Sequence, residues 1–187
     1  MKFVGLTGGI GAGKSTALGA LEELGAATLS TDQVVHDLYK TEEVRDAVLE
    51  RFGTVDRDEL ATRAFATEEG RDWLEQLLWP RVGARIVEWR AQLEQAERAP
   101  RAAVVEVPLL FEAGMEDAFD ATIAVIANED LRAERAGGRG HQALDERSSR
   151  QLSQQEKAGR ATYVVQNDGS ERELLARLSD ILDILER

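Results

Sequence analysis

The chain has 187 residues, 43% hydrophobic and 31% charged, so residues 1–187 are long enough to bury a core as a single domain. It contains no cysteine, which excludes disulfides and thiolate metal sites and is compatible with a reducing compartment. The formal net charge of −12 disfavours nucleic acid and anionic membrane surfaces as partners, although a local basic pocket can still bind phosphate.

The beginning of the chain predicts a buried strand that leads into a glycine-rich loop. Residues 2–7 are mostly apolar, residues 8–13 are rich in glycine, and residues 14–24 carry leucine and alanine at helical spacing. The apolar run is too short for a signal peptide or a membrane span. We therefore expect a cytoplasmic protein.

A helical region follows a second short strand at 27–30. The predicted helices begin at Asp32 and continue over 42–52, 58–66 and 68–98. Asp58 is the expected cap of the third helix, and Pro80 is expected to interrupt the last one. We therefore predict a helical insertion over about 42–98.

The rest of the chain alternates strands and helices. The predicted strands cover 102–107, 121–127 and 163–165, and the predicted helices cover about 145–158 and the residues after the cap Ser170. Residues 137–142 have no periodicity and are expected to be mobile. Continuously apolar strands favour a parallel sheet covered on both faces. The fold class is therefore α/β, a mainly parallel sheet flanked by helices.

The glycine-rich loop fits a phosphate-binding motif. Residues 8–15, Gly-Gly-Ile-Gly-Ala-Gly-Lys-Ser, match G-x-x-x-x-G-K-[ST] completely. Glycines let consecutive backbone N–H groups turn toward phosphate oxygens, and the following helix adds its positive dipole end. Lys14 supplies charge for the β- and γ-phosphates of ATP, and the Ser15 hydroxyl can bind Mg²⁺. The sheet is thus predicted to be of the P-loop NTPase type.

A phosphate loop alone leaves several functions open. We find no Asn-Lys-x-Asp guanine motif of regulatory GTPases, and residues 152–155 lack both glycines of the transport-ATPase signature. A short chain with a helical insertion and a basic segment favours a small-molecule kinase.

Further motifs make the chain resemble the dephospho-coenzyme A kinase family over nearly its whole length. The matching segments are 7–16, 30–32, 36–39, 77–80, 107–112, the series Arg135, Arg139, Arg147, Gln151, Glu156 and Lys157, and 163–170. Residues 107–112, Val-Pro-Leu-Leu-Phe-Glu, are the most distinctive match. Three residues depart from the family pattern: Ser30 replaces an acid, Trp79 a histidine and Glu106 an aspartate.

This resemblance implies transfer of the ATP γ-phosphate to the ribose 3′-hydroxyl of dephospho-CoA. It also implies a core sheet, a helical substrate-binding region and a lid over about 135–150. The implied partner is a small molecule rather than nucleic acid or a membrane, and the oligomeric state is not determined by the sequence.

The implied catalytic residues are Lys14, Asp32 and Arg139. Asp32 would orient the acceptor hydroxyl and take its proton, although an N-cap is its simplest structural role. Arg139 would stabilise charge on the transferring phosphoryl group, as the family's lid arginine does, the alternative being a solvated loop residue. For Arg135 a phosphate contact and a surface ion pair are equally plausible.

The binding residues form three sets. The nucleotide-binding set is Gly9, Gly11, Ala12, Gly13, Lys14, Ser15, Thr16, Asn167 and Gly169, the last two in the family's adenine-binding loop or in a plain turn. The substrate-binding set is Asp32, His36, Leu109, Leu110 and Phe111, with His36 alternatively a solvated helix residue. The metal-binding set is Ser15 and Glu106. Glu106 ends a buried strand, and an ion pair with Lys or Arg is its alternative.

Two rival functions stay open at this stage. One is a P-loop kinase acting on a nucleotide or nucleoside, and residues 108–112 argue against it. The other is a regulator that binds ATP without turnover, and the presence of Lys14, Ser15, Asp32 and Arg139 argues against that.

Overall fold

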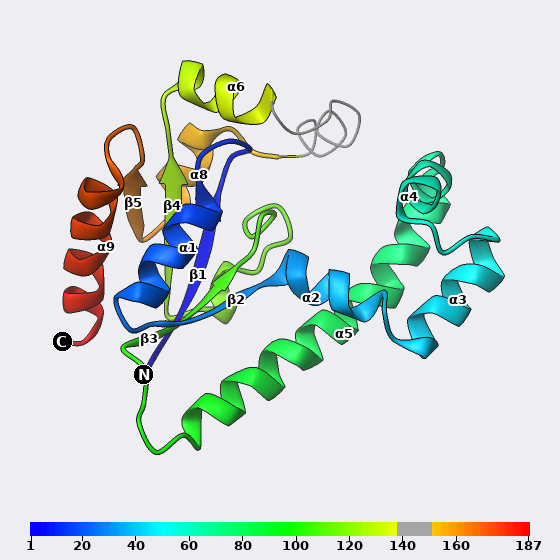
Figure 1. Ribbon diagram of the computed structural model, residues 1–187, viewed down its shortest axis with the longest axis horizontal. Helices are drawn as coiled ribbons and strands as arrows, with labels where there is room; N and C mark the ends of the chain where they lie inside the picture. Colours follow the sequence, from blue (N-terminus) through cyan, green and yellow to red (C-terminus); the bar gives the residue numbers. More distant parts are fainter. Residues whose placement is uncertain (138–150) are drawn as a thin grey trace. The chain divides into compact units, whose positions relative to one another are not determined.

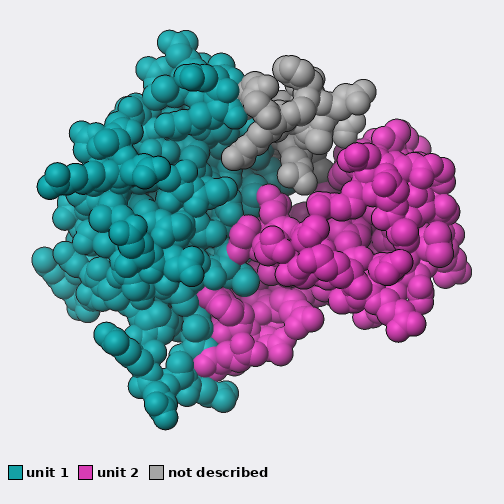
Figure 2. Space-filling model, viewed as in Figure 1, with its two compact units in different colours: residues 1–29, 93–187 teal, residues 30–92 magenta. Residues whose placement is uncertain are grey.

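The computed structural model describes residues 1–137 and 151–187 (Figure 1). The chain divides into two compact units, coloured separately in Figure 2. Unit 1 comprises Met1–Leu29 and Leu93–Arg187, and unit 2 comprises Ser30–Gln92. Unit 2 therefore begins earlier than the insertion expected from residue 42, because it includes the helix that follows Ser30.

A five-stranded sheet in the order β2-β3-β1-β4-β5 is the centre of unit 1 (Figure 1). Its strands are β1 (Lys2–Gly8), β2 (Ala27–Ser30), β3 (Ala102–Glu106), β4 (Ala121–Ile126) and β5 (Tyr163–Gln166). β1 pairs in parallel with β3 and β4, and β4 pairs in parallel with β5. The carboxyl ends of these strands therefore meet at one edge, and the expected parallel α/β sheet is confirmed.

The two faces of β1 bury different partners, because successive side chains in a strand point to opposite faces. Val4 and Leu6 belong to the core shared with α1 (Lys14–Glu23) and α9 (Glu171–Leu185). On the other face, Phe3 stacks on Phe119 with ring centroids 4.8 Å apart. A Cβ atom on Gly5 would lie 2.5 Å from Cδ1 of Leu110, so any larger residue there would require the Leu110 side chain to move.

The last helix follows the predicted pattern. The Ser170 hydroxyl accepts from the N–H of Glu173, whose carboxylate accepts from the N–H of Ser170. This reciprocal capping box satisfies backbone groups that the first turn leaves unpaired. The apolar stripe is buried at residues Leu174, Leu178, Ile181, Leu182 and Leu185, as expected.

The segment before β5 departs from the prediction. A helix was expected over about 145–158, but residues 151–153 are not helical and α8 covers Gln154–Arg160. Ser153 and Glu156 form a capping box that starts α8 at this point. Residues 145–150 lie outside the described part of the chain, as do residues 138–142 of the segment expected to be mobile. Bounds were not predicted for α6 (Glu129–Gly137), although Arg135 was placed on a helix, and the short 3₁₀ helix Glu116–Ala118 was not predicted.

Unit 2 is built from helices. They are α2 (Thr31–Leu38), α3 (Glu42–Phe52), α4 (Arg57–Phe65) and α5 (Glu68–Glu94), the last of which extends two residues beyond the unit. Phe52 and Trp73 meet edge to face with ring centroids 5.4 Å apart, so Trp73 belongs to the packing of this unit. Trp79, by contrast, is 50% exposed.

Two expectations for unit 2 are wrong. The cap of α4 is Asp56, whose carboxylate accepts from the N–H groups of Asp58 and Glu59. Pro80 does not interrupt α5, which is continuous from Glu68 to Glu94. A proline removes one helical N–H donor, here the one that would reach the carbonyl of Gln76, yet the helix continues past it. Within the described residues, 1–137 and 151–187, no helix is both long and apolar enough to cross a membrane.

Candidate active site

The phosphate loop joins β1 to α1 at the carboxyl edge of the sheet. Gly11 has φ 75° and Gly13 has φ 91°, left-handed conformations that glycine adopts without strain. A Cβ atom on Gly13 would also collide with the side-chain amide of Asn167. Glycine is therefore favoured by the backbone conformation at Gly11 and Gly13, and at Gly13 also by the neighbouring side chain.

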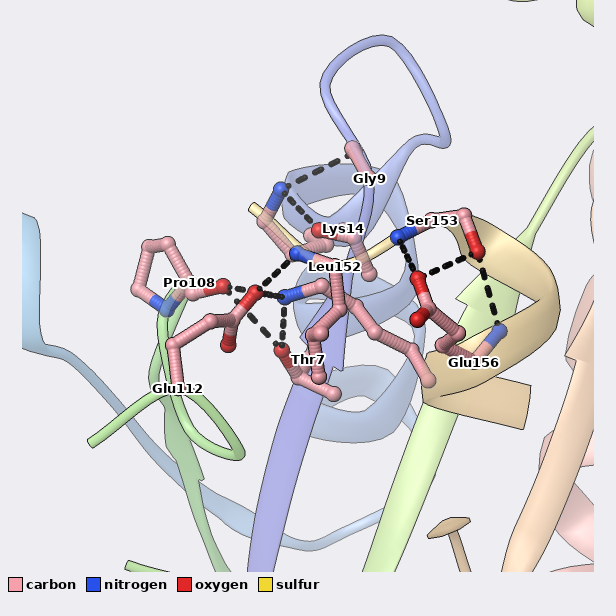
Figure 3. Close-up of polar contacts among 10 residues, drawn as sticks. Thr7, Gly9, Lys14, Pro108, Glu112, Leu152, Ser153 and Glu156 are labelled. Carbon is pink, nitrogen blue, oxygen red and sulfur yellow. Dashed lines mark hydrogen bonds and ion pairs between the residues drawn. The ribbon is translucent and has the colours of Figure 1, made fainter. Parts of the chain in front are cut away.

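The Lys14 side chain folds back over its own loop. Its Nζ donates to the carbonyl of Gly8 at 3.0 Å and to that of Gly9 at 3.2 Å (Figure 3). A mobile ammonium held at the loop is placed to exchange these carbonyls for phosphate oxygens. Ser15 and Thr16 follow in the first turn of α1, and both are exposed.

Asn167 ties the end of β5 to the phosphate loop. Its side chain is buried, its Nδ2 donates to the carbonyl of Ala12 at 2.9 Å, and its N–H donates to that of Ile126 at 2.8 Å. The side-chain amide thus supports the loop, and the adenine contact of Asn167 stays a prediction. Gly169 is exposed, and a Cβ atom there would collide with the carboxylate of Glu173, so glycine preserves the cap of α9.

Two arginines of α6 make hydrogen bonds at the site, Arg132 with the phosphate loop and Arg135 with the residue that follows β5. Arg132 donates from Nε to the carbonyl of Ile10 at 2.9 Å and pairs with Glu129 at 3.0 Å. A Cβ atom on Gly11 would lie 2.5 Å from the carbonyl oxygen of Arg132. Arg135 donates to the carbonyl of Asn167 at 3.2 Å. The two roles weighed for Arg135, a phosphate contact and a surface ion pair, both stay predictions. Sequence reasoning missed Arg132, whose only signal was its spacing of three residues from Arg135.

The carboxylate of Glu106 is a candidate metal ligand. It is 6% exposed at the end of β3, and it lies opposite Leu6 in the neighbouring strand that leads into the phosphate loop. In residues 1–137 and 151–187, no group of three or more His, Cys, Asp or Glu residues could hold a metal. Mg²⁺ commonly uses one or two protein oxygens together with substrate phosphates and water, so the oxygens of Ser15 and Glu106 fit it.

The segment after β3 is largely packed into unit 1. Leu110 is fully buried and Phe111 is 3% exposed, whereas Leu109 is half-buried. Burial gives Leu110 and Phe111 a packing role, and the substrate contacts expected of all three stay predictions.

Asp32 and His36 belong to α2 in unit 2. Ser30 holds the N-cap position of this helix, and the exposed Asp32 lies in its first turn, so the capping role considered for Asp32 is wrong. His36 is half-buried, and its Nδ1 accepts a hydrogen bond from the guanidinium of Arg57 at 2.8 Å. Arg139 and most of the predicted lid lie outside the described residues.

The chain is similar to known proteins over almost its whole length. The family model described as dephospho-CoA kinase matches residues 2–173. The dephospho-CoA kinase of Deinococcus radiodurans is 38% identical over 98% of this chain and 92% of that protein. The solved structure of TT1252 from Thermus thermophilus is 32% identical, with a TM-score of 0.80, over 98% of this chain and 97% of that one.

A structure titled dephospho-CoA kinase from Campylobacter jejuni has a TM-score of 0.69 at 23% identity. It covers 98% of this chain and 96% of that one, and at this identity it supports the fold alone. The family model and the Deinococcus relative both extend over almost the whole sequence. The chain belongs to the dephospho-CoA kinase family.

Proposed function

We propose that this chain transfers the γ-phosphoryl group of ATP to the ribose 3′-hydroxyl of dephospho-CoA. The products are coenzyme A and ADP, and the reaction is the last step of coenzyme A biosynthesis. The observation that supports this best is the family match over residues 2–173, which includes a complete phosphate loop between β1 and α1. We also propose a cytoplasmic location, with which the absence of cysteine is compatible.

The phosphate loop binds the triphosphate of ATP. Its backbone N–H groups and the positive amino end of α1 bind the negatively charged phosphates. Lys14 exchanges its hydrogen bonds to the carbonyls of Gly8 and Gly9 for bonds to phosphate oxygens. Asn167 and Arg132 hold the loop through the carbonyls of Ala12 and Ile10, so that it needs little rearrangement on binding.

Asp32 acts on the acceptor. Its carboxylate accepts the proton of the 3′-hydroxyl while the bond from that oxygen to the γ-phosphorus forms. The bond between the γ-phosphorus and the bridging oxygen breaks at the same time, and ADP leaves with that oxygen. Arg139 stabilises the charge spread over the transferring group.

Ser15 and Glu106 would hold Mg²⁺, Ser15 through its hydroxyl and Glu106 directly or through water. When bound, the ion neutralises charge that develops on the phosphate oxygens. The oxygen donors of these two residues support this assignment.

The test is ADP formation from ATP with different acceptors. Dephospho-CoA is expected to stimulate ADP formation far more than any nucleoside monophosphate. The control is Lys14→Ala, which should lose turnover while keeping its melting midpoint. The reason is that the Lys14 ammonium binds phosphate oxygens and does not pack in the hydrophobic core. Equal stimulation by a nucleoside monophosphate would favour a nucleotide kinase, and ATP binding without ADP release would favour a regulator.

A further inference from the structure

A buried ion pair lies next to Thr7, the residue that precedes the phosphate loop. The side chain of Lys157, from α8, is fully buried, and its Nζ lies 2.8 Å from Oε1 of Glu112. Glu112 follows β3 and its side chain is 12% exposed. Figure 3 draws Glu112 together with Thr7, Pro108 and Lys14.

The Lys157 ammonium joins two segments that border the site. It donates to the carbonyl of Pro108 at 2.7 Å and lies 3.4 Å from the hydroxyl of Thr7. That hydroxyl in turn donates to the same Pro108 carbonyl at 3.3 Å. Thr7 immediately precedes Gly8, whose carbonyl accepts from Lys14. The ammonium therefore connects the base of the phosphate loop to the segment after β3.

Glu112 extends the connection to a third segment. Its Oε1 also accepts the N–H of Leu152 at 2.8 Å, just before the cap of α8. Its Oε2 is buried and has no hydrogen-bond partner among residues 1–137 and 151–187. One carboxylate oxygen thus anchors both Lys157 and the chain that leads into its helix.

Stability alone does not account for this pair. Burial lowers the pKa of Lys157, while the hydrogen bond and charge of Glu112 act in the opposite direction. Removing two charges from water is costly, and replacing a buried ion pair with uncharged side chains of similar size is often neutral or stabilising. Removing one partner is harmful because the other charge is left unpaired.

We propose that Lys157 and Glu112 are positioning residues for phosphoryl transfer. Through Thr7 and Pro108 they fix the start of the phosphate loop relative to the segment after β3, and neither touches substrate. The turnover test of this role rests on the proposed function, because it measures phosphoryl transfer to dephospho-CoA. It uses the directional hydrogen bonds of the ammonium, which an apolar side chain of the same size cannot make.

The test compares Lys157→Met, Glu112→Gln and the double variant, in which no unpaired buried charge is left. Each single variant is expected to lower both the melting midpoint and kcat. The double variant should regain most of the melting midpoint but keep a loss of kcat of about 10- to 100-fold, the scale of a misplacement near 1 Å. A merely structural pair would instead regain both quantities together.

Arg101→Met is the matched control. Arg101 pairs with Asp183 and Glu186 at the amino end of β3, away from the carboxyl edge that carries the loop. The loss of these ion pairs should lower the melting midpoint and leave kcat unchanged.

A second readout does not depend on the acceptor. Amide hydrogen exchange of residues 8–14 with ADP bound should be faster in the double variant than in wild type. Full recovery of kcat and of exchange protection in the double variant would overturn the proposal, as would single variants with wild-type turnover. A wild-type protein inactive on dephospho-CoA would instead overturn the proposed function, and the exchange comparison would still decide the role of the pair.

Discussion

Asp32 lies in the first turn of α2, two residues after the N-cap Ser30. Asp32→Asn is expected to reduce kcat with dephospho-CoA about 10²–10⁴-fold, because an amide cannot accept the hydroxyl proton. The loss of stability should be only about 0.3–1 kcal/mol, the worth of an acid in the first helical turn. Affinity for ATP should change little.

The measurements for this variant are kcat, ATP affinity and the free energy of unfolding. A loss of kcat below about fivefold, far under the range of general-base catalysis, would reduce Asp32 to a positioning residue. A large loss of ATP affinity would place it on the nucleotide side of the reaction.

Arg132 gives a second prediction for a single residue. Arg132→Ala removes the hydrogen bond to the carbonyl of Ile10 and is expected to weaken ADP binding roughly 10-fold, as for a hydrogen bond from a charged group. Glu129→Gln is its control, since it removes the ion pair but leaves the bond to Ile10 intact. Calorimetric titration with ADP measures both. Equal effects of the two variants would show that the bond to the loop is not the cause.

Candidate site residues that belong to a local sequence motif could be named from the sequence. Residues whose role depends on long-range contacts in the folded chain could not. The phosphate-binding role of Lys14 was predicted from its place in the glycine-rich motif alone. Arg132 and the pairing of Lys157 with Glu112 depend on which segments the sheet brings together. The nucleotide contact predicted for Asn167 stays a prediction, and the hydrogen bond from its side-chain amide to the carbonyl of Ala12 had no signal in the sequence. Long-range side-chain contacts of this kind leave no periodic signal.

At the scale of elements, the cap of α4 makes a direct prediction. Asp56→Ala should lower the free energy of unfolding by about 1 kcal/mol, because its carboxylate accepts from two backbone N–H groups. Asp58→Ala should cost less, since Asp58 lies inside the first turn and its N–H is one of those donors. Urea unfolding of both variants provides the measurement. A larger loss for Asp58→Ala would contradict the assigned cap.

Elements with strong periodic or capping signals were predicted well. The bounds expected for β2 and for α3 agree with the structure, and Ser170 caps α9 as predicted. The interruption expected at Pro80 was wrong because buried residues on both sides, Leu78 and Ile86, keep α5 in one piece. Tertiary burial there outweighs the local cost of a proline.

At the scale of the whole molecule, the fold class followed from the sequence and the division into units did not. Alternating strands and helices with continuously apolar strands predicted the parallel sheet, which the structure confirms. The sequence placed the start of the insertion at residue 42, but α2 already belongs to unit 2. Which unit a helix joins depends on its contacts, and these are not visible in its own periodicity.

The most direct measurement follows the γ-phosphorus of ATP into the product. With labelled ATP and dephospho-CoA, the account predicts one labelled phosphate, on the ribose 3′-oxygen, in a product identical to coenzyme A. Lys14→Ala should form little of it. Label that appears only in inorganic phosphate, or in a different acceptor when dephospho-CoA is present, would contradict the account.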